Sequence, residues 1–182
     1  MADLFDSGAE PSEQPQRNRP LADRLRPQTL AQVIGQSQVL GPEAPLGVML
    51  ASGSLSSLIF WGPPGVGKTT IARLLADVTD LHFEPLSAIF SGVADLRKIF
   101  EKARERKAMG QGTLLFIDEI HRFNRAQQDG FLPHMEDGTI VLVGATTENP
   151  SFELNAALLS RSQVMVLKRL DEQGMDDLLV RA

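Results

Sequence analysis

Eight consecutive residues fit the pattern G-x-x-x-x-G-K-[ST]: Gly62-Pro63-Pro64-Gly65-Val66-Gly67-Lys68-Thr69. The glycines lack side chains, so successive backbone N–H groups can curl around phosphate oxygens. The spacing places the Lys68 ammonium at the β- and γ-phosphates and the Thr69 hydroxyl at a bound Mg²⁺. We therefore expect a nucleoside triphosphate and Mg²⁺ to bind at this run.

The residues on either side of the run provide the strand and helix that the pattern requires. Residues 58–61 form a short apolar stretch that is typical of a buried strand. Residues 70–76 have a helical pattern, so a helix N-terminus that begins near Thr70 points at the same anion. A glycine-rich turn that fits the pattern by accident is the alternative, and both flanks argue against it.

Two acidic residues, Asp118 and Glu119, directly follow the apolar residues 114–117. In open α/β sheets, ligands bind at the carboxyl ends of strands, which is where both acids fall. Asp118 would hold Mg²⁺, directly or through water, and Glu119 would polarise the water that attacks the γ-phosphate. A solvated turn also explains an acidic pair after a strand. The phosphate-binding run earlier in the chain favours the catalytic interpretation.

Two further residues are candidates for contacts with the reacting phosphate. Thr147 follows the apolar residues 140–145, and a polar side chain there can hydrogen-bond the γ-phosphate or the attacking water; taken alone, residues 146–150 are only a turn signal. Arg161 lies too far along the chain to serve its own phosphate loop, so it would stabilise transition-state charge in a neighbouring subunit. The alternative is a cation that offsets a helix dipole, and spacing leaves both interpretations of Arg161 open.

The elements that must position these residues alternate along the chain. We expect strands at 57–61, 82–86, 113–118, 140–145 and 164–167, and helices at 68–79, 95–109, 125–135 and 153–160. Apolar strands separated by helices predict an α/β fold with a parallel sheet covered by helices on both faces. Residues 1–18 have no apolar period and predict a disordered tail. Residues 19–170 then form the core, and a further helical pattern begins at 171.

Composition limits the function classes. The chain has 182 residues, of which 42% are hydrophobic, enough to bury one core. Its zero cysteines exclude disulfides and thiolate zinc sites, and His121 has no second ligand at metal spacing. The net charge of -5 argues against a surface that coats nucleic acid. No apolar run could span a bilayer and no signal peptide is visible, so cytoplasm is the default compartment.

Together these motifs resemble the AAA+ ATPases of the clamp-loader and branch-migration-motor branch. Two longer stretches narrow the resemblance to the replication-associated recombination protein A family, bacterial relatives of the Werner helicase-interacting protein. They are Asp118-Glu119-Ile120-His121-Arg122-Phe123-Asn124 and Gly144-Ala145-Thr146-Thr147-Glu148-Asn149-Pro150-Ser151-Phe152-Glu153. The resemblance runs from about Arg19 to the end of the chain.

The resemblance implies a P-loop NTPase of AAA+ type that hydrolyses ATP with Mg²⁺ at stalled replication forks, in recombination and repair. It implies that Thr147 is sensor 1 and Arg161 an arginine finger acting in trans. It places Ile34 and Gly35 at the adenine, and makes Ser87 a candidate for the polar residue that restrains Glu119 until DNA binds.

The same resemblance implies that residues 171–182 begin a helical lid, with the sensor 2 arginine and the oligomerisation region beyond Ala182. The chain would then be the N-terminal ATPase core of a homo-oligomer, itself monomeric and weakly active or inactive. Single-strand-binding protein is an implied partner, and the bacterial nucleoid the implied location.

DNA contacts are less clear in the residues themselves. Six basic residues between 97 and 107 are interleaved with acids, which is typical of a solvated helix, with phosphate contact as the alternative. With no tyrosine and one tryptophan, the chain offers no aromatic ladder, so DNA forks, gaps or ends would be bound through backbone contacts. Asp3-Leu4-Phe5 resembles the end of a sliding-clamp docking peptide, although an ordinary tail is the favoured explanation because three residues carry little information.

Two classes of function remain in competition. One is a Mg²⁺-dependent ATPase that remodels DNA or its bound proteins, with a clamp-loader subunit or a branch-migration motor as its nearest variants. The other is a nucleotide-gated scaffold that recruits replication proteins and hydrolyses ATP slowly. Glu119 favours the enzyme, because a scaffold does not need an activated water.

Overall fold

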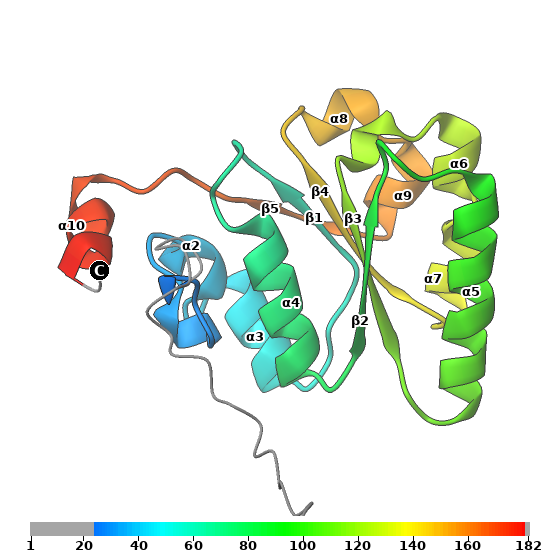
Figure 1. The fold of residues 1–182 in the computed structure, drawn as a ribbon, viewed down its shortest axis with the longest axis horizontal. Coiled ribbons are helices and arrows are strands. Elements are labelled where there is room, and N and C mark those ends of the chain that lie inside the picture. Colours follow the sequence, from blue (N-terminus) through cyan, green and yellow to red (C-terminus); the bar gives the residue numbers. More distant parts are fainter. Residues whose placement is uncertain (1–23, 181–182) are drawn as a thin grey trace, which may run out of the picture.

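The computed structural model describes residues 24–180, and its centre is a sheet of five parallel strands in the order β2-β3-β4-β1-β5 (Figure 1). The strands are β1 (Leu58–Trp61), β2 (His82–Ser87), β3 (Thr113–Asp118), β4 (Val141–Thr146) and β5 (Gln163–Val166). Nearly every residue of β1, β3 and β4 is buried, as expected for strands that are covered on both faces. The predicted parallel sheet is confirmed.

Helices pack on both faces of this sheet (Figure 1). The first face carries η2 (Leu30–Gln32), α2 (Ser37–Leu40), α3 (Pro45–Ala51) and α4 (Lys68–Val78). The second carries α5 (Val93–Ala108), η3 (Ile120–Arg122), α6 (Arg125–Asp129), α7 (Leu132–Glu136) and α9 (Ala156–Ser160). Neighbouring residues of β1 serve the two cores in turn, because Leu58 and Phe60 join the first and Ile59 the second.

The predicted helix 125–135 is wrong in one respect, because the structure divides it into α6 and α7. Pro133 is the reason: it has no backbone N–H, and its ring would clash with the carbonyl of residue 129 inside a continuous helix. Proline is tolerated in the first turn of a helix, and Pro133 lies in the first turn of α7. Gly130 ends α6.

The predicted helix 153–160 is likewise two helices, α8 (Pro150–Glu153) and α9. Leu154 between them is extended, with φ −102° and ψ 148°. Asn155 then starts α9, because its Oδ1 accepts a hydrogen bond of 2.7 Å from the Leu158 N–H. An asparagine side chain satisfies a free N–H at a helix start, so it favours a new helix over the continuation of the old one.

The sheet register brings three strand ends together. Trp61, the last residue of β1, pairs with Thr146, the last residue of β4. β3 pairs with the other side of β4 and ends at Asp118. Because all strands are parallel, the loops after β1, β3 and β4 leave the sheet at one edge, where ligands bind in such folds.

Gly144 in β4 lets the turn after β3 approach the sheet. A Cβ added at Gly144 would lie 2.8 Å from Ile120 Cδ1 and 2.9 Å from Ile59 Cδ1. Ile120 in η3 is fully buried on this glycine. The absence of one side chain therefore sets the height of η3, and of His121 beside it, above the sheet.

α10 (Glu172–Val180) lies beyond the β5 edge (Figure 1). Within residues 24–180, no helix combines the length and apolar character needed to cross a membrane. The predicted tail 1–18 and Asp3-Leu4-Phe5 fall outside the described residues.

Candidate nucleotide site

The loop between β1 and α4 has the backbone of a phosphate cradle. Gly65 has φ +81° and Gly67 φ +96°, conformations that residues with a Cβ rarely adopt. No atom lies within 4 Å of a Cβ added at Gly65, so backbone conformation and not crowding requires glycine there. Gly62 differs, because its added Cβ would lie 2.4 Å from the Leu167 carbonyl oxygen. The run 62–69 and Thr70 thus connect the end of β1 to the first turn of α4.

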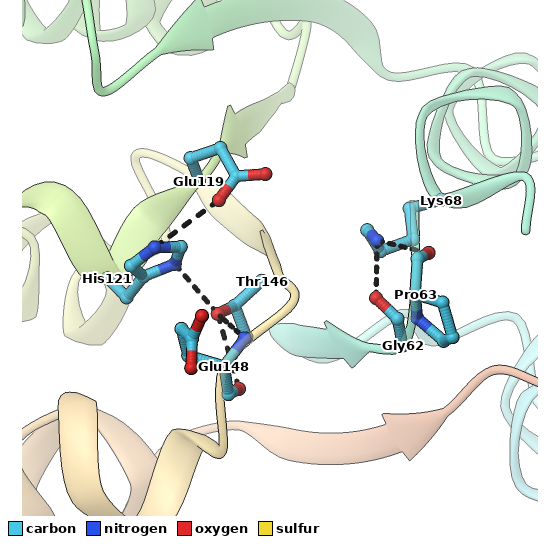
Figure 2. Close-up of polar contacts among 7 residues, drawn as sticks. All are labelled: Gly62, Pro63, Lys68, Glu119, His121, Thr146 and Glu148. Carbon is cyan, nitrogen blue, oxygen red and sulfur yellow. Dashed lines mark hydrogen bonds and ion pairs between the residues drawn. The ribbon is translucent and has the colours of Figure 1, made fainter. Parts of the chain in front are cut away.

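Lys68 lies at the start of α4 and is buried, with 8% of its surface exposed. Its Nζ donates hydrogen bonds of 2.6 Å to the Gly62 carbonyl and 2.9 Å to the Pro63 carbonyl (Figure 2). Burial lowers the pKa of the Lys68 ammonium, while the carboxylates of Glu119 and Asp118 oppose this shift by favouring the charged form. The residues predicted from two separate motifs therefore share one electrostatic environment.

The chemistry of the donors fits Mg²⁺. Thr69 offers an exposed hydroxyl in the first turn of α4, and Asp118 offers a half-buried carboxylate at the end of β3. Hydroxyl and carboxylate oxygens are hard ligands of the kind that Mg²⁺ takes together with substrate phosphates and water. Thr69 and Thr70 also line a hollow on the outer side of α4, whose wall includes Arg26 and Arg73.

Glu119 adopts a left-handed backbone conformation, with φ 54° and ψ 44°. This conformation costs a residue with a side chain roughly 1 kcal/mol or more, and it is concentrated at functional sites. It turns the chain sharply from β3 into η3, where the Arg122 N–H donates to the Glu119 carbonyl at 2.9 Å.

A hydrogen-bonded network that the sequence did not predict joins Glu119 and His121, which follow β3, to Thr146 at the end of β4 (Figure 2). His121 Nε2 lies 3.3 Å from Glu119 Oε2. His121 Nδ1 lies 2.8 Å from Thr146 Oγ1, which also accepts a 3.0 Å hydrogen bond from the Glu148 N–H. The only sequence signal was the polar character of His121 and Thr146 beside residues already selected.

The structure gives two of the selected residues other surroundings. Ser87 pairs with Asp118 in the β2–β3 register, whereas the side chain bonded to Glu119 is His121. Thr147 is half-buried just after β4, while Thr146, its neighbour, is fully buried within the network. Thr147 as sensor 1 stays a prediction.

Arg161 lies at the end of α9 and pairs with Glu136 of α7. Its Nε and Nη2 are each 2.6 Å from Glu136 Oε1, and its Nη1 donates to the Ala157 carbonyl at 3.1 Å. The last contact is the one expected of a cation at a helix C-terminus. Gln163, two residues later, pairs with Leu58 at the start of β1, so the strand separates Arg161 from its own P-loop by roughly 10 Å or more.

Ile34 and Gly35 lie beside the chain that follows β5. A Cβ added at Gly35, whose φ is +75°, would meet Leu170 Cδ2 at 2.5 Å, and Ile34 packs against Gly174 of α10. The same segment after β5 touches the P-loop at Gly62 through Leu167. Their predicted place at the adenine is compatible with these contacts and stays a prediction.

Comparison with known families agrees with this geometry. Residues 58–170 match the family described as ATPase family associated with various cellular activities (AAA). The chain belongs to the AAA family.

Proteins with similar sequences include a replication-associated recombination protein and an ATPase. It is 52% identical over 164 residues to replication-associated recombination protein A of Escherichia coli K12, covering 90% of this chain and 37% of that protein. It is 46% identical over 162 residues to ATPase WRNIP1 of Dictyostelium discoideum, covering 89% of this chain and 18% of that protein. The chain therefore spans little more than a third of the length of the bacterial relative.

A solved structure shows the same AAA fold. The Holliday junction branch migration motor RuvB of Thermotoga maritima superposes with a TM-score of 0.71 at 30% identity, covering 86% of this chain and 53% of that one. The expected P-loop NTPase fold of AAA+ type, and the resemblance to replication-associated recombination protein A, are both confirmed.

Proposed function

We propose that this chain binds ATP with Mg²⁺ and hydrolyses it. One observation carries the proposal: the buried ammonium of Lys68, held in a glycine cradle, shares its surroundings with the carboxylates of Asp118 and Glu119. A cation beside backbone N–H donors binds phosphate, and a carboxylate at the same edge can take a proton from water. Membership of the AAA family of ATPases supports this reading.

Each residue has a distinct role in the proposal. Lys68 binds the β- and γ-phosphates, while Thr69 and Asp118 hold Mg²⁺, which neutralises charge on the phosphate oxygens when bound. Glu119 orients the attacking water and accepts its proton as the water oxygen bonds to the γ-phosphorus, while the bond from that phosphorus to the β–γ bridging oxygen breaks and ADP leaves. Thr147 contacts the γ-phosphate, and Arg161 acts on the site of a neighbouring subunit.

At the level of the cell, we propose a DNA-associated role at stalled replication forks, in recombination and repair. The names of the relatives support it, since they include a replication-associated recombination protein and a branch migration motor. The proposal includes homo-oligomerisation, a lid that begins near residue 171, DNA-backbone contacts, and the sliding clamp and single-strand-binding protein as partners. It places the protein at the bacterial nucleoid in the cytoplasm.

The test measures ATP affinity and steady-state ATP hydrolysis for two proteins. One is this chain, and the other is a longer version of it that continues beyond residue 182 to the length of the bacterial relative. Each is assayed with and without forked or gapped DNA, and with Glu119→Gln as the matched variant. We expect the longer protein to hydrolyse ATP faster with DNA, and Glu119→Gln to bind ATP normally while turnover falls about 100-fold.

Three results would change the assignment. ATP binding without turnover in either protein would replace the enzyme with a nucleotide-gated scaffold. Turnover that Glu119→Gln leaves intact would remove Glu119 as the residue that activates water. Turnover coupled to clamp opening or to junction movement would instead identify a clamp-loader subunit or a branch-migration motor.

A further inference from the structure

We propose that His121 is a positioning residue that orients the Glu119 carboxylate and links it to the end of β4 through Thr146. The inference rests on the proposed function of Glu119. The side chain of His121 is only 9% exposed. Its two ring nitrogens contact Glu119 and Thr146, one residue each.

The hydrogen bonds determine which nitrogen of His121 carries the proton. An ionised carboxylate only accepts hydrogen bonds, so Glu119 Oε2 requires a proton on His121 Nε2. In the neutral ring Nδ1 is then an acceptor, and the Thr146 hydroxyl donates to it across 2.8 Å. The Thr146 oxygen in turn accepts from the Glu148 N–H at 3.0 Å. The Thr146 hydroxyl has a single proton and a second acceptor, the Glu148 carbonyl at 3.3 Å, and the shorter contact favours donation to His121 Nδ1.

The geometry favours a productive orientation of Glu119. His121 takes Oε2, while the other carboxylate oxygen points toward the side on which Lys68 lies (Figure 2). A carboxylate with one oxygen fixed and the other free can accept a proton from water in a defined direction. An exposed glutamate without this partner would sample several rotamers, and ordering it at each turnover would cost free energy.

Thr146 also connects the network to the phosphate loop. Its backbone carbonyl accepts a 3.1 Å hydrogen bond from the Gly62 N–H, and its side chain contacts His121. A movement of the loop after β4 is therefore transmitted through Thr146 both to Glu119 and to the start of the P-loop. A threonine, histidine and glutamate in a row also resemble a nucleophilic triad, but Thr146 is fully buried and has no access to a substrate.

Matched substitutions separate the two bonds of His121 in the longer protein described above. His121→Gln places an amide N–H near the position of Nε2 and keeps a donor for Glu119, whereas His121→Asn reaches only Thr146. We expect His121→Ala and His121→Asn to lower kcat about tenfold or more with ATP affinity within twofold of wild type. His121→Gln should recover most of kcat.

The Thr146 link has its own pair of variants. Thr146→Val removes the hydroxyl at nearly constant volume, and Thr146→Ser keeps it. Thr146→Val should lower kcat several-fold, and Thr146→Ser should not. Equal kcat for His121→Ala and wild type, or recovery with asparagine and not with glutamine, would overturn the proposal.

Nitrogen NMR of the imidazole rings gives a readout that does not depend on turnover. The chain contains three histidines, so His82→Gln and His134→Gln suffice to assign the His121 signals. We expect a proton on Nε2 that shifts in Glu119→Ala and not in Glu148→Ala, whose side chain is exposed. A proton on Nδ1, or no response to Glu119→Ala, would refute the hydrogen bond.

The two readouts distinguish failure of this inference from failure of the proposed function. Hydrolysis that is insensitive to His121 leaves the ATPase intact and removes the positioning role. An Nε2–H bond to Glu119 in a protein without hydrolysis shows the contact but refutes both the proposed ATPase and a positioning role in it.

Discussion

The two halves of the site are built in different ways. The phosphate loop is one continuous segment whose function depends on backbone conformation, shown by the positive φ angles of Gly65 and Gly67. The carboxylate side is assembled from side chains of separate segments, with Glu119 and His121 after β3 and Thr146 at the end of β4. A site formed by one continuous segment depends on the local backbone geometry of that segment. A site formed by side chains from separate segments depends on how those segments pack. Different kinds of substitution should therefore disable the two halves.

The largest effect is expected from removing the cation of the phosphate loop. Lys68→Ala should weaken ATP binding roughly 100-fold, because a hydrogen bond to a charged group contributes about 1.5 to 3 kcal/mol and each factor of ten is about 1.4 kcal/mol. Isothermal titration or a fluorescent ATP analogue measures the change. Lys98→Ala, in an exposed residue of α5, is the control. Unchanged affinity in Lys68→Ala would remove Lys68 from the phosphate site.

The carboxylate side should fail through packing when Gly144 acquires a side chain. Gly144→Ala should destabilise the fold by about 2 kcal/mol, because the new Cβ meets Ile120 and Ile59 below 3 Å. It should also lower hydrolysis more than ATP affinity, since η3 carries His121 away from Glu119. Denaturant unfolding and turnover measure the two effects.

A second substitution tests the cause assigned to Gly144. Ile120→Val removes the Cδ1 atom that lies 2.8 Å from the added Cβ, so the double variant should recover part of the lost stability. Strict additivity of the two single effects would show that contact with Ile120 is not the reason.

Two glycines with similar backbone separate stability from binding on the phosphate-loop side. Gly65 and Gly53 both have positive φ, at +81° and +68°, and both have open space around an added Cβ. Alanine at either position should cost about 1 kcal/mol of unfolding free energy. Only Gly65→Ala should weaken ATP binding, by about tenfold. Equal ATP affinity in both variants would show that the cradle tolerates a side chain.

The smallest effect in the isolated chain is expected at Arg161, which belongs to neither half. Its pair with Glu136 is largely exposed, so Arg161→Ala should change unfolding free energy by less than about 1 kcal/mol and leave ATP affinity unchanged. Turnover should fall only where subunits associate. Mixing Arg161→Ala with Lys68→Ala protein tests this, because each subunit lacks what the other supplies. Turnover that never responds to mixing would contradict the trans role.

The same contrast explains what the sequence predicted well. The phosphate loop was predicted because its signal lies in consecutive residues, and β3 was predicted with its exact ends because an apolar run stops at Asp118. The contact between His121 and Thr146 was not predicted, because it joins residues 25 positions apart and depends on the height that Gly144 gives to η3. The hydrophobic periodicity of the sequence gives no information on contacts between residues that lie so far apart in the chain.

The short helices α2 and α3 were also absent from the predictions. Ser37 and Val39 in α2, and Pro45, Gly47 and Val48 in α3, have weak helix propensity. An added Cβ at Gly47 would meet the Gly41 carbonyl oxygen, so α3 packs closely against the end of α2. Tertiary packing, with Val39 and Leu46 in the core of the first face, fixes these helices.

The position of β1 between β4 and β5 has a consequence for the order in which the protein forms. Its partners are β4 and β5, and Leu58 pairs with Val143 and Gln163, far along the chain. During synthesis one edge of β1 stays unpaired until residues up to 146 have left the ribosome, and its other edge until residues up to 166 have done so. Pairings at such sequence separation form slowly and expose apolar segments meanwhile. ATP can therefore stabilise the finished core, but it cannot guide the nascent chain toward it.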